Sequence, residues 1–413
     1  MIDTNGITCC GCGACAQICP QNCIGMQENN EGFLYPVIHA EKCIQCRLCE
    51  NVCPVLNPIN RRECDLNEAW GGYCKDQSLL LTSSSGGIFS VLAQQILTES
   101  GCVYGAAFTE DFGAVRHIEV EATDDLQLLC GSKYMQSELG SSFLSVRKSL
   151  EQGRRVLFSG TPCQVAGLKT FLGKNYPELI CVDVICHGTP PAKLWRKYLN
   201  YLENRYGAKA NSVSFRHKRS GWRKFGMQIE TNESKTYYCD LDQDTFLQLF
   251  LNNCCLRESC YQCKVKETGS GADLTLGDFW GVEKCDPSLE NALGVSLVLI
   301  HTKVGKNLLE KVMPALQGKA IPAKSAIKWN TAYLCSVRRP VSRDRFFKDI
   351  DCMHWESVAN KYKHGSLYSR LRKAISKSPF GLIIKATIYC AKAGGGSTYG
   401  LYVQFHTSST ERN

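Results

Sequence analysis

The stretch VLFSGTPCQVAG, residues 156–167, predicts how the middle of the chain folds. Its first three residues are apolar and indicate the end of a buried strand, residues 159–162 favour a tight turn, and the residues from Gln164 onward favour a helix. Cys163 is therefore expected where a strand ends and a helix begins. Ligands of open α/β sheets usually bind at such strand ends, and helix N-terminal amides favour a thiolate. Cys163 is a candidate metal ligand or nucleophile, with a small buried structural cysteine as the third interpretation.

Alternating strand-like and helix-like stretches surround this segment and predict an α/β domain over residues 70–302. The expected strands are GCVYGAAF, RRVLFSG, LICVDVIC and GVSLVLI, and the expected helices are FSVLAQQILTES and SSFLSVRKSLEQG. Residues 1–58 precede it as a small cysteine-rich domain, and residues 303–413 follow as a basic, mainly helical region with a loose tail. The chain as a whole is predicted to be of the α+β class.

The cysteine content is the unusual feature of the composition. The chain has 413 residues, of which 44% are hydrophobic, and 26 cysteines, ten of them within the first 53 residues. The opening residues MIDTNGITCCGCG contain no apolar signal sequence, so we expect a cytoplasmic location. Clustered cysteines in a reducing compartment favour metal binding over disulfides.

The basic charge is concentrated at the C-terminal end. Residues 303–413 carry 20 Lys and Arg against 6 Asp and Glu, a net charge of +14, whereas residues 1–302 carry 28 against 33, a net charge of −5. No nucleic-acid-binding motif accompanies this charge, so we expect no nucleic-acid partner. The segment SRLRKAISKSPFGLIIKATIYCAKA, residues 369–393, is too short and too charged to span a bilayer. We favour a basic amphipathic helix packed on its own protein, with peripheral contact to an anionic membrane as the alternative.

Two cysteine runs in residues 1–58 follow the pattern C-x2-C-x2-C-x3-C-P, as CCGCGACAQICP from residue 9 and CIQCRLCENVCP from residue 43. In this pattern three close cysteines bind one 4Fe-4S cluster, and the fourth, before the proline, binds the other. The predicted ligand sets are Cys9, Cys12, Cys15 and Cys53 for one cluster, and Cys43, Cys46, Cys49 and Cys19 for the other. The segment resembles bacterial two-cluster ferredoxins. A zinc module is the alternative, but zinc sites usually pair two shorter elements. Cys10 and Cys23 lie outside the pattern and are expected to be buried bystanders.

A third group of cysteines follows from the predicted sheet. Cys186, like Cys163, ends an apolar strand, and Cys260 and Cys263 form a C-x2-C pair. Two strand-end cysteines can meet such a loop at one end of the sheet, so these four are the predicted ligands of a third 4Fe-4S cluster. Cys255 is left open as a replacement for Cys163 or Cys186.

Seven motifs between residues 83 and 284 carry a resemblance to a known family. They are SSSGGIFSVLA, GSKYMQS, SGTPCQVAGL, ICHG, SFRHKRSGW, CLRESCYQCK and LGDFWG. In this order they resemble the beta subunit of the hydrogenases and dehydrogenases that use the deazaflavin coenzyme F420. The resemblance implies a flavoprotein with FAD and at least one 4Fe-4S cluster beside it, and it does not imply one substrate.

The residues that would hold FAD lie in two stretches with the chemistry for a pyrophosphate. Ser85, Gly86 and Gly87 precede an apolar helix, whose first amides can bind phosphate. The second stretch offers a cation, an aromatic ring and polar donors, in Gly131, Ser132, Lys133, Tyr134, Gln136 and Ser137. The basic run Arg216-His217-Lys218-Arg219 could gather phosphate or an anionic substrate, and Lys218 in it is a further candidate for binding the cofactor. Ordinary helix capping and a solvated hairpin are the alternatives for these stretches.

Two residues are candidate catalytic groups. His187 could supply a proton during reduction, or orient the loop beside the cluster. Asp278 could hydrogen-bond flavin or ribose, or cap a turn.

The preferred function is an FAD-dependent iron–sulfur oxidoreductase. It would pass electrons from the ferredoxin-type clusters through the third cluster to FAD, and on to a small-molecule or deazaflavin substrate. The alternative is a non-catalytic electron-transfer subunit that serves a partner enzyme. The expected electron donor is reduced ferredoxin or a similar low-potential protein, and a homo-oligomer is left open. The sequence does not predict the substrate, the direction of electron flow or the use of coenzyme F420.

Overall fold

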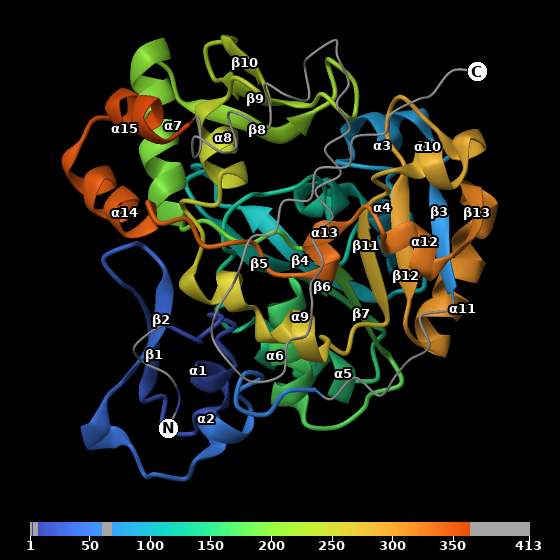
Figure 1. Ribbon diagram of the computed structural model, residues 1–413. Helices are drawn as coiled ribbons and strands as arrows, with labels where there is room; N and C mark the ends of the chain where they lie inside the picture. Colours follow the sequence, from blue (N-terminus) through green and yellow to red (C-terminus); the bar gives the residue numbers. More distant parts are fainter. Residues whose placement is uncertain (1, 3–6, 60–67, 364–413) are drawn as a thin grey trace, which may run out of the picture. The chain divides into compact units, whose positions relative to one another are not determined.

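The computed structural model describes residue 2 and residues 7–59 and 68–363 (Figure 1). The N-terminal part contains two short helices and one antiparallel hairpin, in which Ile24 pairs with Ile38. Its elements are α1 (Ala14–Ile18), β1 (Ile24–Glu28), β2 (Leu34–Ile38) and α2 (Leu48–Asn51). The amphipathic segment 369–393 and the tail lie outside the described residues.

An eight-stranded mixed sheet forms the centre of the structure, in the order β13-β3-β12-β11-β7-β6-β4-β5. Its four neighbouring strands β4, β6, β7 and β11 are parallel, and the strands on either side of them are antiparallel. The strands are β3 (Glu68–Cys74), β4 (Cys102–Phe108), β5 (Val115–Val120), β6 (Val156–Gly160), β7 (Leu179–Val184), β11 (Leu274–Asp278), β12 (Ser296–Ile300) and β13 (Leu316–Pro322). The four predicted strands correspond to β4, β6, β7 and β12.

Side chains of successive residues alternate between the two faces of this sheet, and each face is covered by helices. Leu157 packs in the same cluster as residues of α4 (Ile88–Thr98) and α11 (Lys303–Val312). Val156 and Phe158 pack on the other face with α5 (Ser142–Glu151) and α6 (Pro162–Leu172). The predicted helices α4 and α5 are therefore confirmed.

The strand–turn–helix prediction for residues 156–167 is also confirmed. Thr161 caps α6 in a capping box, in which its backbone N–H donates to Gln164 Oε1 at 2.9 Å. Pro162 occupies the first turn, where its missing N–H costs nothing. Cys163 therefore lies in the first turn of α6, at the carboxyl end of β6.

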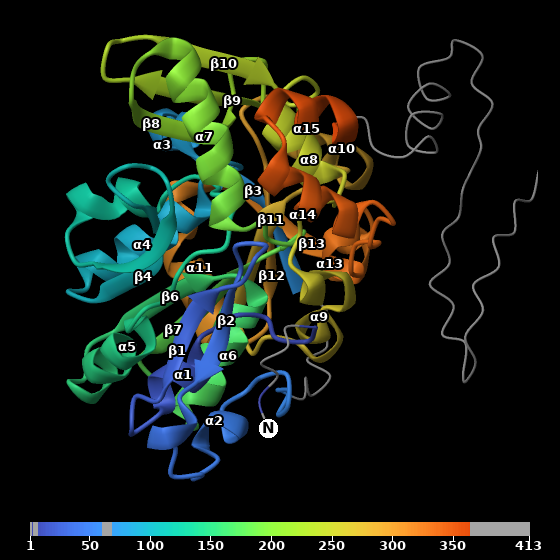
Figure 2. The ribbon, with the colours of Figure 1, turned by 90° about the vertical axis from the view of Figure 1, so that its left-hand side faces the viewer.

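A second, three-stranded sheet packs against helices from two parts of the chain (Figure 2). Its strands are β8 (Ala210–His217), β9 (Gly226–Thr231) and β10 (Thr236–Asp240), and the helices are α7 (Ala192–Tyr206), α8 (Thr245–Leu251), α14 (Arg343–Cys352) and α15 (Trp355–Tyr362). Their aromatic side chains share one core, in which Trp195 and Phe246 are fully buried.

Short elements complete the described residues. They are α3 (Gln77–Thr82), α9 (Lys264–Thr268), α10 (Val282–Cys285), α12 (Ala323–Ile327) and α13 (Thr331–Leu334), with 3₁₀ turns at Ala40–Lys42, Thr123–Leu129, Glu258–Gln262, Pro287–Leu289 and Met313–Ala315. The predicted domain boundaries near residues 58 and 302 stay predictions, although β13 pairs with β3 and so extends the sheet beyond residue 302. No helix among the described residues is long and apolar enough to cross a membrane.

Candidate functional site

A cavity of about 610 Å³ lies at the carboxyl ends of the parallel strands. It is lined by residues 159–164 at the end of β6 and beyond it, residues 184–189 at the end of β7 and beyond it, and residues 276–278 at the end of β11. Its volume is typical of a site for a small molecule or cofactor, about 300–1,000 Å³. We call it the central cavity.

The central cavity gathers all four cysteines that were predicted to bind a third cluster: Cys163, Cys186, Cys260 and Cys263. Their thiols interact electrostatically, and burial is the main cause that raises the pKa of Cys186, of Cys263 and, to about 11, of Cys260. Cys255 instead lies in the aromatic core beside Cys254 and is absent from the cavity lining. The geometry thus favours these four cysteines over a set that includes Cys255.

The environment of Cys163 also bears on the nucleophile interpretation. A hydrogen bond with the Cys10 thiol and burial both raise the pKa of Cys163, and Thr161 Oγ1 lies 3.2 Å from its sulfur. A nucleophilic cysteine needs a lowered pKa. The surroundings of Cys163 therefore argue against an activated nucleophile.

Three members of the first ferredoxin-type set and all four members of the second also lie near one another. Cys9, Cys15 and Cys53 interact electrostatically, and burial raises the pKa of Cys15 to about 12. A small cavity of about 30 Å³ is lined by the members of the other set, Cys19, Cys43, Cys46 and Cys49, together with Cys23. Cys23 is buried, and its sulfur lies 3.3 Å from that of Cys19.

No disulfide joins any cysteines in the described part of the chain. In the same residues, no three His, Cys, Asp or Glu side chains converge closely enough to hold a single metal ion.

Arg257 connects the N-terminal cysteine run to the wall of the central cavity. Its side chain is 1% exposed and donates to Cys9 O at 2.8 Å, to Leu34 O at 2.8 Å and to Gln136 Oε1 at 2.8 Å. Gln136 lines the cavity, and its Nε2 donates to Cys10 O and Gly11 O, both at 3.3 Å. Gly11 makes this approach possible, because a Cβ there would lie 2.4 Å from Gln136 Nε2. The N-terminal part is therefore docked on the cavity through a buried cation.

The same interface brings two cysteine groups into contact. The Cys10 thiol lies beside the Cys163 thiol and lines the central cavity, while its sequence neighbour Cys9 belongs to the ferredoxin-type set. Cys12 packs on α6, since a Cβ on Gly167 would lie 2.9 Å from its sulfur. The prediction that Cys10 is a buried bystander did not anticipate its contact with Cys163.

The first predicted phosphate-binding loop borders the cavity in part. Ser85 and Gly87 line it, whereas Gly86 is turned toward the sheet, where its N–H donates to Ser296 Oγ at 2.8 Å. Lys218 is absent from the lining and lies behind the loop, donating to Leu80 O at 2.6 Å and to Ser85 O at 2.8 Å. Burial lowers its pKa to about 8. Lys218 therefore positions the loop.

The second predicted loop lies entirely on the cavity wall, as Gly131, Ser132, Lys133, Tyr134, Gln136 and Ser137. Burial lowers the pKa of Lys133 to about 8, and its ammonium donates to Cys130 O at 2.9 Å. The Tyr134 ring stacks on Phe250, with ring centroids 4.7 Å apart.

Ser137 is held in a buried network beneath this loop. Gln164 Nε2 donates to its hydroxyl at 2.8 Å, and His117 Nδ1 lies 3.0 Å from the same oxygen. The network ties the loop of residues 131–137 to the turn that carries Cys163. Ser137 thus braces the cavity wall.

The two candidate catalytic residues both line the central cavity. His187 Nε2 lies 2.6 Å from Asn253 Oδ1, an amide oxygen that can only accept, and burial lowers the pKa of the imidazole. Its neutral form is therefore favoured, with the proton on Nε2. Asp278 accepts from Trp222 Nε1 at 3.1 Å and forms an ion pair with Arg216.

Sequence reasoning missed two residues of this site, Cys10 and Arg257. Arg216 lies in the basic run of residues 216–219 that was expected to gather an anion, but the run alone does not tell which of its cations faces the cavity. Arg257 lies between Cys255 and Cys260 in the sequence, but its contact with Cys9 joins residues that are 248 positions apart. No local pattern signals such a contact.

Comparison with known proteins places two segments of the chain in families. Residues 153–325 match the family described as the C terminus of the beta subunit of coenzyme F420 hydrogenase/dehydrogenase. Residues 8–57 match the 4Fe-4S dicluster domain. The predicted resemblance and the ferredoxin-type domain are thereby confirmed.

Two relatives illustrate these matches. A segment of 60 residues is 35% identical to an uncharacterised polyferredoxin-like protein of Methanocaldococcus jannaschii, and it covers 13% of this chain and 36% of that protein. The chain thus spans about a third of that relative's length. A solved chain of the F420-reducing NiFe hydrogenase complex from Methanosarcina barkeri is 16% identical with a TM-score of 0.43, over 66% of this chain and 95% of that one.

The two family matches lead to one conclusion. Residues 8–57 belong with the 4Fe-4S dicluster domains, and residues 153–325 are related to the C-terminal part of the beta subunit of coenzyme F420 hydrogenase/dehydrogenase.

Proposed function

We propose that the chain is a flavoprotein oxidoreductase whose central cavity binds FAD beside a third 4Fe-4S cluster. The observation that carries the proposal is the meeting of three features at one cavity. The four cysteines Cys163, Cys186, Cys260 and Cys263 line it, two loops of small and polar residues line it, and the dicluster domain docks on it through Arg257. A site with this composition serves redox chemistry better than ligand binding alone.

The donor sets suit the proposed groups. Thiolates are the usual ligands of 4Fe-4S clusters. The proposal is supported by the closeness of all four cysteines in two of the predicted sets and of Cys9, Cys15 and Cys53 in the remaining one. When bound, the clusters exchange single electrons, and FAD connects single-electron donors to two-electron chemistry. Cys9, Cys12, Cys15 and Cys53 would hold the cluster nearest the cavity, because Cys9 adjoins Cys10 and Cys10 contacts Cys163. This closeness supports a path for electrons between the dicluster domain and the cavity.

The chain's own residues account for flavin binding in the proposed site. Gly87 immediately precedes α4, so the first amides of that helix are available to an anionic phosphate. Lys133 adds a buried cation and Tyr134 an aromatic wall. Lys218 and Ser137 act indirectly, since each holds one of the two loops in place.

His187 is proposed as the proton-handling group of the cavity. Its ring is neutral near pH 7, and the bond to Asn253 leaves Nδ1 as the acceptor. Asp278 is proposed to position Arg216 for the cavity ligand. We place the protein in the cytoplasm, with reduced ferredoxin or an equivalent low-potential protein as donor.

The test combines flavin analysis with turnover. Protein purified without oxygen should release one FAD per chain, and its flavin should be reduced by a low-potential donor protein. The contrary result is full iron content without flavin. Steady-state reduction of a small molecule would separate the enzyme from the alternative, a non-catalytic electron-transfer subunit.

A further inference from the structure

Arg216 on β8 is a buried cation that uses only part of its hydrogen-bonding capacity. Its side chain is 8% exposed, and its Nη1 donates to Asp278 Oδ2 in an ion pair. Its Nε and Nη2 atoms are buried and have no hydrogen-bond partner among the described residues. Buried polar groups nearly always have partners, and an unsatisfied charged donor is costly. The two atoms are therefore open to an acceptor that the described part of the chain does not supply.

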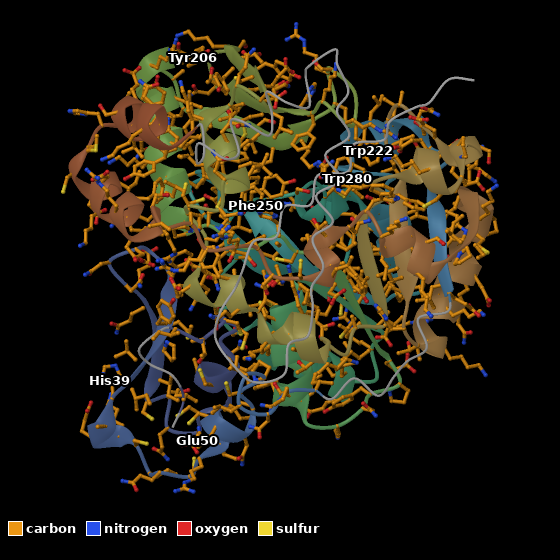
Figure 3. All side chains as sticks on the ribbon, viewed as in Figure 1. His39, Glu50, Tyr206, Trp222, Phe250 and Trp280 are labelled. Atoms are coloured by element: carbon orange, nitrogen blue, oxygen red, sulfur yellow. The ribbon has the colours of Figure 1, made fainter. Side chains whose placement is uncertain are left out.

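The surroundings hold the guanidinium group in a fixed position on the cavity wall. Arg216 lines the central cavity, and its guanidinium lies 4.3 Å from the centre of the Phe225 ring. Asp278, its ion-pair partner, is held by Trp222 Nε1 at 3.1 Å. Trp222 in turn stacks on Trp280 with centroids 5.0 Å apart, and both are labelled in Figure 3 with Phe250. A planar cation fixed in this way is preorganised for a planar or tetrahedral anion.

The charge of the cavity lining points the same way. Among the lining residues, Asp278 is the one carboxylate, and it is already paired with Arg216. The basic side chains of the lining are Lys133, Arg216, Arg223, Lys264 and Lys266, of which Arg223 is paired with Glu283 and Glu290 outside the lining. Such an excess of positive charge attracts anions to a cleft.

We infer that Arg216 binds an anionic group of the cavity ligand, a phosphate or a carboxylate, through Nε and Nη2. These two N–H groups lie on one edge of the guanidinium plane and match two oxygens of such an anion. The Tyr134 hydroxyl lies near the guanidinium group of Arg216, and Tyr134 also lines the central cavity. The inference rests on the proposed function in that the anion is either the pyrophosphate of FAD or an acidic group of the substrate.

The test compares Arg216→Gln and Arg216→Lys with the control Arg219→Gln in the full-length, iron-loaded protein. Arg219 is exposed, lies 5.0 Å from the Tyr238 ring and does not line the cavity. Folding is checked by iron content and near-ultraviolet circular dichroism. The double variant Arg216→Gln with Asp278→Asn avoids an unpaired buried carboxylate if the single variant does not fold.

Two titrations distinguish the sources of the anion. If FAD supplies it, Arg216→Gln binds FAD about 10- to 150-fold more weakly, the range expected for lost charged hydrogen bonds. If the substrate supplies it, FAD binding is unchanged and inorganic phosphate, used as the probe on the same protein, binds at least about tenfold more weakly. Arg216→Lys should also lose most of the affinity for the same ligand, because a lysine lacks the paired donors of the guanidinium group.

The inference is overturned if both FAD and phosphate bind to Arg216→Gln as they bind to Arg219→Gln. A wild-type protein that binds no FAD at any concentration would instead remove the proposed function. The phosphate titration would still decide the role of Arg216 in that case.

Discussion

Replacing Arg257 by alanine should loosen the dicluster domain from the central cavity. The change removes donors to three acceptors, Cys9 O, Leu34 O and Gln136 Oε1, and it removes a guanidinium that lies 4.0 Å from the Tyr35 ring centre. Hydrogen bonds to charged groups contribute about 1.5–3 kcal/mol each, but bonds of one network are not additive. A buried acceptor that is left without a donor costs about 1–3 kcal/mol, and for the three acceptors of this one network we expect a total loss of about 3–5 kcal/mol.

The matched control is Arg196→Ala at the same interface. Arg196 Nη2 lies 2.9 Å from Glu28 Oε1, so this pair also joins α7 to the N-terminal part, but its two side chains are 38% and 37% exposed. An exposed ion pair of this kind contributes about 0–1 kcal/mol. Both variants remove one arginine from the interface, and only Arg257→Ala leaves buried acceptors without a donor.

Hydrogen exchange measured by mass spectrometry separates the two parts of the molecule. If exchange is limited by local opening, a loss of about 3–5 kcal/mol speeds exchange in β1 and β2 by about 10²- to 10⁴-fold, up to the limit set by global unfolding. Peptides from β6 and β7 should change little. Iron content must remain at the wild-type level for the comparison to hold. Exchange in β1 and β2 that is no faster than in Arg196→Ala would refute the role assigned to Arg257.

Two further outcomes are expected. Cys163→Ser should lose about four irons while the signals of both ferredoxin-type clusters remain. The control Cys10→Ala alters the neighbouring thiol and should keep all its iron. Equal iron content in both variants would count against Cys163 as a ligand. Burial lowers the pKa of Lys218 to about 8 in the folded state, whereas it is about 10.4 in the unfolded state. Between these two pH values the unfolded state binds more protons, so the free energy of unfolding rises with pH. Relative to Lys218→Met, the wild type should gain up to about 3 kcal/mol in unfolding free energy between pH 8 and 10.4. If the unfolding free energies of the two proteins depend on pH in the same way, the pKa of Lys218 is not lowered in the folded state.

Patterns within short segments predicted the parts of the fold that depend on neighbouring residues. Residues 156–167 indicated a strand, a turn and a helix because apolar residues, the turn at residues 159–162 and the helix-forming residues after it act locally. Cys163 and Cys186 could be expected at one edge because the ends of adjacent parallel strands meet there. The ferredoxin-type sets were predictable since their spacing is itself the geometric requirement.

Contacts between distant segments were beyond such reasoning. The predicted boundary at residue 58 suggested a separable N-terminal domain, yet Arg257 and Arg343 are buried against that domain. Arg343 donates two hydrogen bonds to the Glu31 carboxylate, of 2.8 and 2.7 Å. Which of Arg216 and Lys218 faces the cavity depends on how β8 ends and on what packs beneath it. These are tertiary facts, and a charge run in the sequence carries no information on them.

The central claim is that the cavity lined by Cys163, Cys186, Cys260 and Cys263 holds a third cluster beside FAD. The most direct measurement is the content of iron, acid-labile sulfide and FAD in anaerobically purified protein and in the double variant Cys260→Ser with Cys263→Ser. The account predicts about twelve irons, about twelve sulfides and one FAD per wild-type chain, and about eight irons in the variant. About eight irons in both proteins would contradict it.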